Sequence, residues 1–170
     1  MKAIPAGVLF VCLGNICRSP TAEYVARAEF ARVGLALPVA SRGLGDWHVG
    51  QGADPRAIAA ARVAGYDLGP HRARQFALGD FAKFATVLAV DRTTLAELKR
   101  LAPRGTPVPQ RLLVAAGLAQ AGADGDIPDP YSGTQDDFRD TLLLIQRGVR
   151  ALAARLAAQP DDRRLAHGNK

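Results

Sequence analysis

Four short apolar runs along the chain alternate with segments whose apolar residues recur at helical spacing. The runs cover residues 8–11, 39–41, 86–90 and 111–114, and the second is the weakest. Residues 8–11 (Val-Leu-Phe-Val) are β-branched, aromatic or leucine throughout, as is typical of a strand buried on both faces. Strand-like runs that alternate with helical patterns predict βα units around a parallel sheet.

The helices between these runs have recognisable starts. Ser19 can serve as the N-cap of the first helix, and Pro20 then occupies the first helical position, where its missing N–H costs nothing. Asp54 and Pro55 start a second helix. After the third strand, Thr94 and Glu97 have the spacing of a capping box, so we expect a third helix there.

The C-terminal third combines a long loop with the clearest helix of the chain. Residues 115–133 are rich in Gly, Ala, Asp and Pro and indicate a loop of the length that often serves function. The helix that follows carries one apolar stripe, formed by Phe138, Leu142, Ile145, Val149, Leu152 and Leu156. Beyond Gln159 the chain is polar, so we expect a frayed tail over residues 159–170.

Composition narrows the class of protein. A chain of 170 residues with 48% hydrophobic and 22% charged residues fits one globular domain. No apolar run reaches the roughly 18 residues of a membrane span, and we expect neither a signal peptide nor membrane association. Two cysteines are too few for a disulfide framework, which favours a cytoplasmic location. The net charge of +6 would suit nucleic acid as a partner, but no basic run or aromatic platform supports nucleic-acid binding, so we expect none.

The segment between the first strand and the first helix carries the candidate chemistry. A helix N-terminus at the end of a buried strand binds anions through free N–H groups and the helix dipole. Gly14 and Asn15 tolerate the left-handed backbone that turns successive N–H groups toward one anion. Arg18 can grip two phosphate oxygens. Cys12 lies where the dipole and the guanidinium both favour a thiolate, and Ser19 could donate to its sulfur. The pattern predicts a phosphate cradle above a nucleophile.

Cysteine followed six positions later by arginine is weak evidence alone, so the surrounding sequence decides. A strand precedes the motif, Gly-Asn lies inside it and Ser-Pro opens a helix after it. A Walker A loop needs a Gly-Lys pair before the helix, and a thioredoxin-like site needs two residues between its cysteines instead of four. Zinc needs more ligands than two cysteines and three scattered histidines readily supply. We therefore expect no metal and no cofactor.

Residues 8–23 (Val-Leu-Phe-Val-Cys-Leu-Gly-Asn-Ile-Cys-Arg-Ser-Pro-Thr-Ala-Glu) resemble the opening of the low-molecular-weight protein tyrosine phosphatases. Three later stretches match that family in order: Asp46-Trp47-His48-Val49-Gly50 with Asp54-Pro55-Arg56, then His71-Arg72-Ala73-Arg74-Gln75, then Asp129-Pro130-Tyr131. The resemblance covers residues 7 to 157. It implies a three-layer α/β sandwich, whose four-stranded parallel sheet has the order 2-1-3-4 and carries helices on both faces. We expect a single phosphatase domain over residues 1–158.

The resemblance also implies roles for the loop and for one carboxylate. Cys12 would form a phosphocysteine. Arg18 would bind phosphate together with the loop residues Leu13, Gly14, Asn15, Ile16, Cys17 and Ser19. A single carboxyl can protonate the leaving group and then activate water. The residues alone offer Asp124, Asp126 and Asp129, and the resemblance selects Asp129 because Pro-Tyr follows it.

The walls of the substrate cleft follow from the same resemblance. Trp47 and Tyr131 match aromatic residues that flank the phosphorylated ring, although either could instead be packing. Vertebrate members often carry a second tyrosine where this chain has Ser132, which leaves one wall less aromatic. Ile16 favours phosphotyrosine because the related protein-arginine phosphatases tend to have threonine there. The alternatives to a tyrosine phosphatase are a protein-arginine phosphatase and a non-catalytic phosphotyrosine-binding module.

The remaining matched residues concern protection, support and partners. Cys17 matches a cysteine that can trap Cys12 as a reversible disulfide, or it is simply a small buried side chain. Arsenate reductases share the loop but need further thiols downstream, and none follows Cys17. Asp91 is interpreted as a helix cap, although the family has an acidic residue here near the loop; we interpret His71, Arg72 and Arg74 as structural. The implied partner is a tyrosine-phosphorylated protein, for bacterial members a tyrosine kinase.

Overall fold

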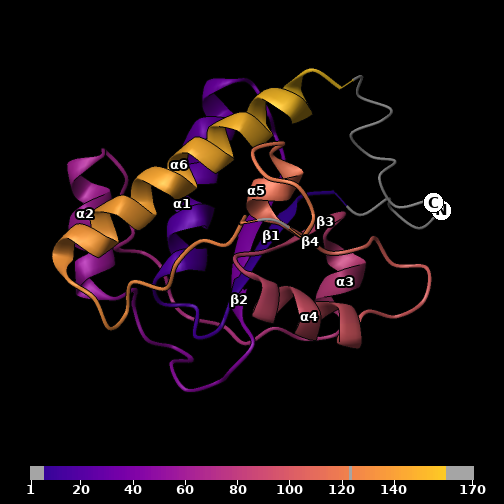
Figure 1. The fold of residues 1–170 in the computed structure, drawn as a ribbon, viewed down its shortest axis with the longest axis horizontal. Helices are drawn as coiled ribbons and strands as arrows, with labels where there is room; N and C mark the ends of the chain where they lie inside the picture. Colours follow the sequence, from indigo (N-terminus) through magenta and orange to yellow (C-terminus); the bar gives the residue numbers. More distant parts are fainter. Residues whose placement is uncertain (1–5, 123, 160–170) are drawn as a thin grey trace.

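A computed structural model describes residues 6–122 and 124–159. These residues form four strands and six helices, and one or two helices follow each strand (Figure 1). In chain order the elements are β1 (Val8–Cys12), α1 (Arg18–Arg32), β2 (Val39–Gly43), α2 (Pro55–Val63), α3 (Asp80–Lys83), β3 (Thr86–Ala89), α4 (Arg92–Leu101), β4 (Gln110–Arg111), α5 (Leu112–Ala115) and α6 (Gln135–Ala157).

The strands form one parallel sheet with the order β2-β1-β3-β4, which confirms the predicted topology. β1 lies in the centre, where Val8 pairs with Val39 of β2 and with Thr86 of β3. All five residues of β1 are buried. The carboxyl end of this central strand therefore opens directly onto the segment that carries Cys12, the position at which ligands bind in open α/β sheets.

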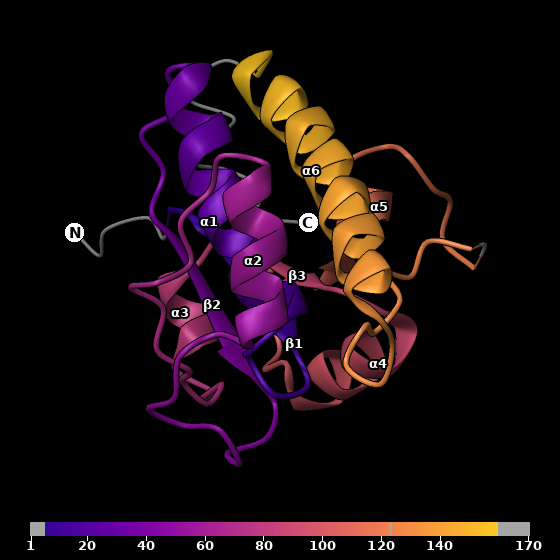
Figure 2. The same cartoon turned by 90° about the vertical axis from the view of Figure 1, so that its left-hand side faces the viewer.

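Successive residues of β1 face two different cores, as the two-residue period of a strand requires. Val8, Phe10 and Cys12 belong to the larger core, which α1, α2, α5 and α6 cover. Leu9 and Val11 belong to the smaller core under α3 and α4. Figure 2 shows α1, α2 and α6 on the near side of the strands. The three layers, helices on both faces of a sheet, agree with the predicted sandwich.

Two predicted helix caps are wrong. Helix α1 begins at Arg18 with Cys17 at the N-cap position, so Ser19 lies inside the first turn. Its hydroxyl is directed instead at the Cys12 sulfur, 2.9 Å away. Helix α4 is capped by Asp91, whose carboxylate accepts the N–H of Thr94 at 2.8 Å. Thr94 therefore receives the cap instead of supplying it, while the interpretation of Asp91 as a cap is confirmed.

The fourth predicted strand is only partly correct. β4 pairs with β3 over two residues, and the chain then turns into α5. The apolar side chains of Leu112 and Leu113 are buried against Gly148 of α6, not in the sheet. The predicted long loop extends from residue 116 to Thr134, the N-cap of α6. The predicted tail falls on residues 159–170, and all but the first of these lie outside the described part of the chain.

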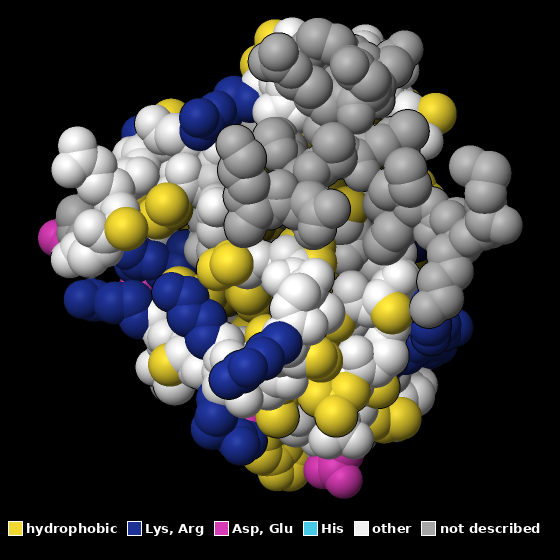
Figure 3. Space-filling model, turned by 90° about the vertical axis from the view of Figure 1, so that its right-hand side faces the viewer, with side chains coloured by type: hydrophobic (Ala, Val, Ile, Leu, Met, Phe, Trp, Pro, Cys, Tyr) yellow, Lys and Arg dark blue, Asp and Glu magenta, His cyan; other side chains and the backbone are white. Residues whose placement is uncertain are grey.

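Basic side chains outnumber acidic ones on the face of the molecule that Figure 3 shows. On the face shown in Figure 3, several Lys and Arg side chains lie near one another at the lower left and others lie apart from them, while Asp and Glu are sparse. This distribution agrees with the net charge of +6. No helix among the described residues is long and apolar enough to cross a membrane.

Candidate active site

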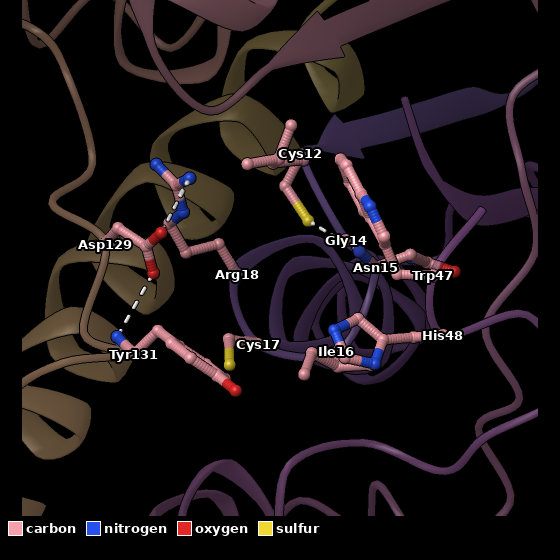
Figure 4. Close-up of a pocket in the computed structure, with 11 residues that line it drawn as sticks. Cys12, Gly14, Asn15, Ile16, Cys17, Arg18, Trp47, His48, Asp129 and Tyr131 are labelled. Carbon is pink, nitrogen blue, oxygen red and sulfur yellow. Dashed lines mark hydrogen bonds and ion pairs between the residues drawn. The ribbon is translucent and has the colours of Figure 1, made fainter. Parts of the chain in front are cut away.

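The segment from Cys12 to Arg18 lines the floor of a pocket at the carboxyl end of β1 (Figure 4). Two backbone bonds attach it to the neighbouring segment: Leu44 N–H donates to the Cys12 carbonyl and Gly45 N–H to the Leu13 carbonyl, both at 2.9 Å. The carbonyl of Ile16 accepts the N–H of Asp54 at 2.8 Å. The carbonyls of the loop are thus bound from outside, which leaves its N–H groups to face inward.

Several of these N–H groups have no partner in the described part of the chain. Those of Leu13, Gly14, Ile16 and Cys17 donate to no other protein group there. The N–H of Asn15 points at the Cys12 sulfur, 3.2 Å away, and Ser19 Oγ contacts the same sulfur at 2.9 Å. Unpaired N–H groups that converge at a helix N-terminus form a site for an oxyanion.

Asn15 holds the loop in this shape. It is the only non-glycine residue with positive φ among the described residues, at 58°, and it is 1% exposed. Its amide nitrogen donates to Ser19 Oγ at 2.8 Å and to Ser41 Oγ at 2.9 Å, while its amide oxygen accepts the backbone N–H of Arg74 at 2.9 Å. Every hydrogen-bonding position of this amide except one acceptor site is therefore used.

The groups around Asn15 are themselves bound. Ser41 donates to buried Glu23 at 2.8 Å. The Asn15 carbonyl lies 2.8 Å from Nε2 of His71, and because a carbonyl can only accept, Nε2 carries the proton. Burial lowers the pKa of His71 and favours the neutral ring. The prediction that His71 and Arg74 are structural is consistent with these bonds, which support the loop from below.

Arg18 is anchored on one side and open on the other. Its Nη1 donates to Asp91 at 2.7 Å and to the carbonyl of Ile127 at 2.9 Å. Burial opposes ionisation of Asp91, but hydrogen bonds from Thr94 and Arg18 outweigh it and hold the pKa of this carboxyl below its usual value. Because one edge of the guanidinium is used in this way, the other edge is oriented toward the pocket.

Asp129 lies beside the guanidinium of Arg18 at the rim of the pocket, on the side opposite Trp47 and His48 (Figure 4). Its Oδ2 lies 3.6 Å from Nη2 of Arg18, and its Oδ1 accepts the N–H of Tyr131 at 3.1 Å. Its side chain is half exposed. Of the other two carboxylates that the sequence offered, Asp126 pairs with Arg92 and Arg111, and neither Asp124 nor Asp126 lines the pocket.

Aromatic side chains form the rim. Trp47 and Tyr131 are 62% and 52% exposed, and both line the pocket together with Ile16. The indole of Trp47 lies directly over Gly45, where any side chain would collide with the ring. His48 also lines the pocket beside Gly14, a placement that sequence reasoning missed. The three predicted cleft residues are thus at one opening.

Cys17 lines the same pocket but differs from Cys12 in its surroundings. Burial and the carboxylate of Asp54 raise the pKa of the Cys17 thiol, so this cysteine keeps its proton. Both cysteines are free and buried. Ser19, in contrast to the other predicted phosphate-binding residues, does not line the pocket but lies behind the Cys12 sulfur. Among the described residues, no group of three or more His, Cys, Asp or Glu side chains is arranged to hold a metal ion.

The residues that hold the loop in place could not be identified from the sequence. Ser41 and Ile127 have no motif of their own, and Glu23 ends the family-like stretch of residues 8–23 without a role that the sequence indicates. The only available signals were an asparagine in a loop that needs a left-handed residue, and an aspartate after the third strand. Of the residues that sequence analysis singled out for the site, the pocket brings together Cys12 to Arg18, Trp47, Asp129 and Tyr131, whereas Ser19 lies behind the Cys12 sulfur.

Comparison with known proteins identifies the family. The family model for low molecular weight phosphotyrosine protein phosphatases matches residues 7–162. The low molecular weight protein-tyrosine-phosphatase of Streptomyces coelicolor is 43% identical over 159 residues, which cover 92% of this chain and 96% of the relative. A relative from Schizosaccharomyces pombe, named low molecular weight phosphotyrosine protein phosphatase, is 38% identical over 81% of this chain and 88% of its own.

A solved structure agrees with this result. The low molecular weight phosphotyrosine phosphatase from Vibrio cholerae superposes with a TM-score of 0.82 and 31% identity, over 91% of this chain and 98% of that one. In this chain Cys12 ends β1 and Arg18 begins α1, which is the position expected for the family. Members of this group are hydrolases. The chain therefore belongs to the low molecular weight phosphotyrosine protein phosphatase family.

Proposed function

We propose that this enzyme hydrolyses phosphotyrosine in proteins through a phosphocysteine intermediate. The observation that carries the proposal is the Cys12 sulfur, which lies beneath loop N–H groups that have no partner among the described residues and in the same pocket as a half-exposed carboxylate. A phosphoryl group seated on those N–H groups has its phosphorus above the sulfur. Its ester oxygen then points out of the pocket toward Asp129.

The first step transfers the phosphoryl group to sulfur. The Cys12 thiolate, which accepts hydrogen bonds from Asn15 N–H and Ser19 Oγ–H, attacks phosphorus in line with the ester oxygen. The S–P bond forms as the P–O bond to tyrosine breaks, and protonated Asp129 gives its proton to the departing phenolate oxygen. Arg18 and the loop N–H groups stabilise the charge on the three equatorial oxygens.

The second step releases phosphate. Asp129, now a carboxylate, takes a proton from a water molecule that attacks phosphorus from the side the tyrosine has left. The P–S bond breaks, and the sulfur leaves as a thiolate that the same two donors stabilise. Inorganic phosphate is the product, and Asp129 is again protonated. No metal ion enters either step.

The rim supports an aromatic substrate. Trp47, Tyr131 and Ile16 offer apolar surface on the walls above the phosphate site, where a phenyl ring would lie. For the partner we propose a tyrosine-phosphorylated protein of the cytoplasm. Solved structures of Wzb from Vibrio vulnificus and of the tyrosine phosphatase Wzb from Escherichia coli K30 are similar to this chain at 26% identity. A bacterial tyrosine kinase, the partner that the family resemblance implies, is the first candidate to assay.

Turnover of p-nitrophenyl phosphate in EDTA tests the proposal. We expect activity in the native enzyme, none in Cys12→Ser, and accumulation of a protein species one phosphoryl group heavier in Asp129→Asn during reaction. Asp129→Asn should lose about 10²–10⁴-fold in rate with a leaving group poorer than p-nitrophenol. Asp124→Asn is the matched control, because this carboxylate belongs to the same loop but does not line the pocket.

Two results would contradict the proposal. Full activity of Cys12→Ser would mean that the nucleophile is misassigned, and tight binding of phosphotyrosine peptides without turnover would identify a binding module. Substrate class is tested separately with matched phosphotyrosine and phosphoarginine peptides. A higher kcat/KM on phosphoarginine would favour the arginine phosphatase, and Ile16→Thr should shift the ratio toward phosphoarginine.

A further inference from the structure

Arg56 connects the aromatic rim of the pocket to the interior of the protein. Its guanidinium carbon lies 5.5 Å from the ring centroid of Tyr131 and 4.4 Å from that of Phe138. Phe138 is buried in the first turns of α6, whereas half of Tyr131 is exposed at the pocket. A guanidinium within about 6 Å of an aromatic centroid is attracted by the ring, so one side chain holds both rings.

The other edge of the same guanidinium is fixed to Asp54. Arg56 Nε and Nη2 donate to the two carboxylate oxygens at 3.1 and 2.9 Å, which is the forked geometry that only arginine provides. Asp54 is 8% exposed and caps α2 by accepting the backbone N–H of Arg56. These hydrogen bonds hold the pKa of Asp54 below its usual value, so the carboxylate is charged.

Asp54 is in turn joined to the phosphate loop. Its backbone N–H donates to the carbonyl of Ile16 at 2.8 Å. On the opposite side, the Arg56 carbonyl accepts the side-chain amide of Gln135, in the first turn of α6, at 3.1 Å. A continuous set of contacts therefore runs from the loop through Asp54 and Arg56 to Tyr131.

We infer that Arg56 is a positioning residue that places Tyr131 at the distance from the phosphate loop that an aryl phosphate requires. Arg56 does not line the pocket and touches no reacting atom. Its effect is exerted through the Tyr131 ring, which is half exposed and gains a preferred orientation from the guanidinium. Removal of Arg56 should weaken the binding of the aryl group while the binding of the phosphoryl group is retained. The inference rests on the proposed function only in taking phosphotyrosine as the natural ligand.

Binding of two phosphonates tests the inference without turnover. Benzylphosphonate carries an aryl ring beside its anion, and methylphosphonate presents the anion with a methyl group alone. By calorimetry, we expect Arg56→Met to weaken benzylphosphonate by about 3–10-fold and to change methylphosphonate by less than about 2-fold. Arg56→Lys, which keeps the charge but loses the planar fork, should fall between the native protein and Arg56→Met.

Arg62→Met is the matched control, because Arg62 belongs to the same helix but does not line the pocket and contacts neither ring. It should bind both phosphonates like the native protein. Equal weakening of both ligands by Arg56→Met would overturn the inference, because the loop itself would then have moved through Asp54. Unchanged benzylphosphonate affinity would overturn it as well. If Arg56→Met does not fold, the same two comparisons apply to Arg56→Lys.

The two proposals fail separately in this design. A native protein that binds both phosphonates but never hydrolyses p-nitrophenyl phosphate would refute the proposed catalysis and leave the role of Arg56 intact. The role of Arg56 alone would be refuted by a different pair of results. The native protein would hydrolyse its substrate normally, and the Arg56→Met variant would bind benzylphosphonate at native strength.

Discussion

Replacement of Asn15 by alanine should destabilise the fold through the loss of three buried hydrogen bonds. The side chain of Asn15 bonds Ser19 Oγ, Ser41 Oγ and the N–H of Arg74 at 2.8 to 2.9 Å, and the residue is 1% exposed. Alanine provides none of these bonds. It also retains the left-handed backbone at φ 58°, which a side chain without a polar group tolerates poorly.

The expected magnitude follows from these contacts. Each buried hydrogen bond contributes about 1 kcal/mol net, so three contribute about 3 kcal/mol. The left-handed conformation adds about 1 kcal/mol for alanine relative to asparagine, whose short polar chain visits that region readily. The sum of about 4 kcal/mol is a large part of the 5–15 kcal/mol typical of a domain. For a chain of 170 residues it corresponds to a fall in Tm of about 8–16 °C.

Glycine at the same position separates the two contributions. Asn15→Gly loses the same three bonds but has no strain at positive φ, although it loses more backbone entropy on folding. We therefore expect it to be about 0.5–1 kcal/mol less destabilised than Asn15→Ala. Urea unfolding followed by circular dichroism measures both variants under the same conditions. A loss below about 1 kcal/mol in Asn15→Ala, or a glycine variant clearly less stable than the alanine variant, would refute this reasoning.

Three further predictions concern the support and the rim of the pocket. Asp91→Asn keeps a cap for α4 but removes the charge that faces Arg18. The free energy of unfolding in urea should therefore fall by about 1–3 kcal/mol, and by less in saturating phosphate, whose charge also faces Arg18. An equal fall with and without phosphate would contradict this prediction. Burial lowers the pKa of His71, so its contribution to stability is present above about pH 6.5 and is lost as the pH falls through the lowered pKa of the folded state. His71→Gln should therefore flatten the dependence of Tm on pH between about 7 and 5, and an unchanged slope would exclude His71 as its source. Gly45→Ala should displace the indole of Trp47, which changes the fluorescence of this single tryptophan. The KM for p-nitrophenyl phosphate should rise, while inhibition by inorganic phosphate stays unchanged.

The elements next to the pocket could be predicted because their signals are local. Residues 8–11 are apolar on both faces of a strand, and the loop after them contains its own glycine, asparagine and helix start. The fourth strand was predicted only in part, because its local signal is ambiguous. A short apolar run such as residues 111–114 suits a strand or a buried helix equally, and the choice depends on α6, whose Gly148 receives Leu112 and Leu113.

The supporting contacts could not be predicted because they join distant segments. Arg18 and Asp91 are 73 positions apart, and Asn15 and Arg74 are 59 apart. No local pattern states which aspartate will face which arginine, since the sheet topology decides it. Asp91 illustrates the limit: the cap was readable from the start of a helix, but the bond to Arg18 was not.

The phosphate loop is locally unfavourable, and this explains where its support comes from. A row of N–H groups without partners among the described residues and a left-handed asparagine both cost free energy in the absence of ligand. Contacts from β2, from residues 71–74 and from the start of α4 offset that cost. Changes to these contacts should therefore reduce stability and turnover together. Changes at the rim, where Trp47 and Tyr131 are largely exposed, should alter the choice of substrate and leave the fold nearly as stable as before.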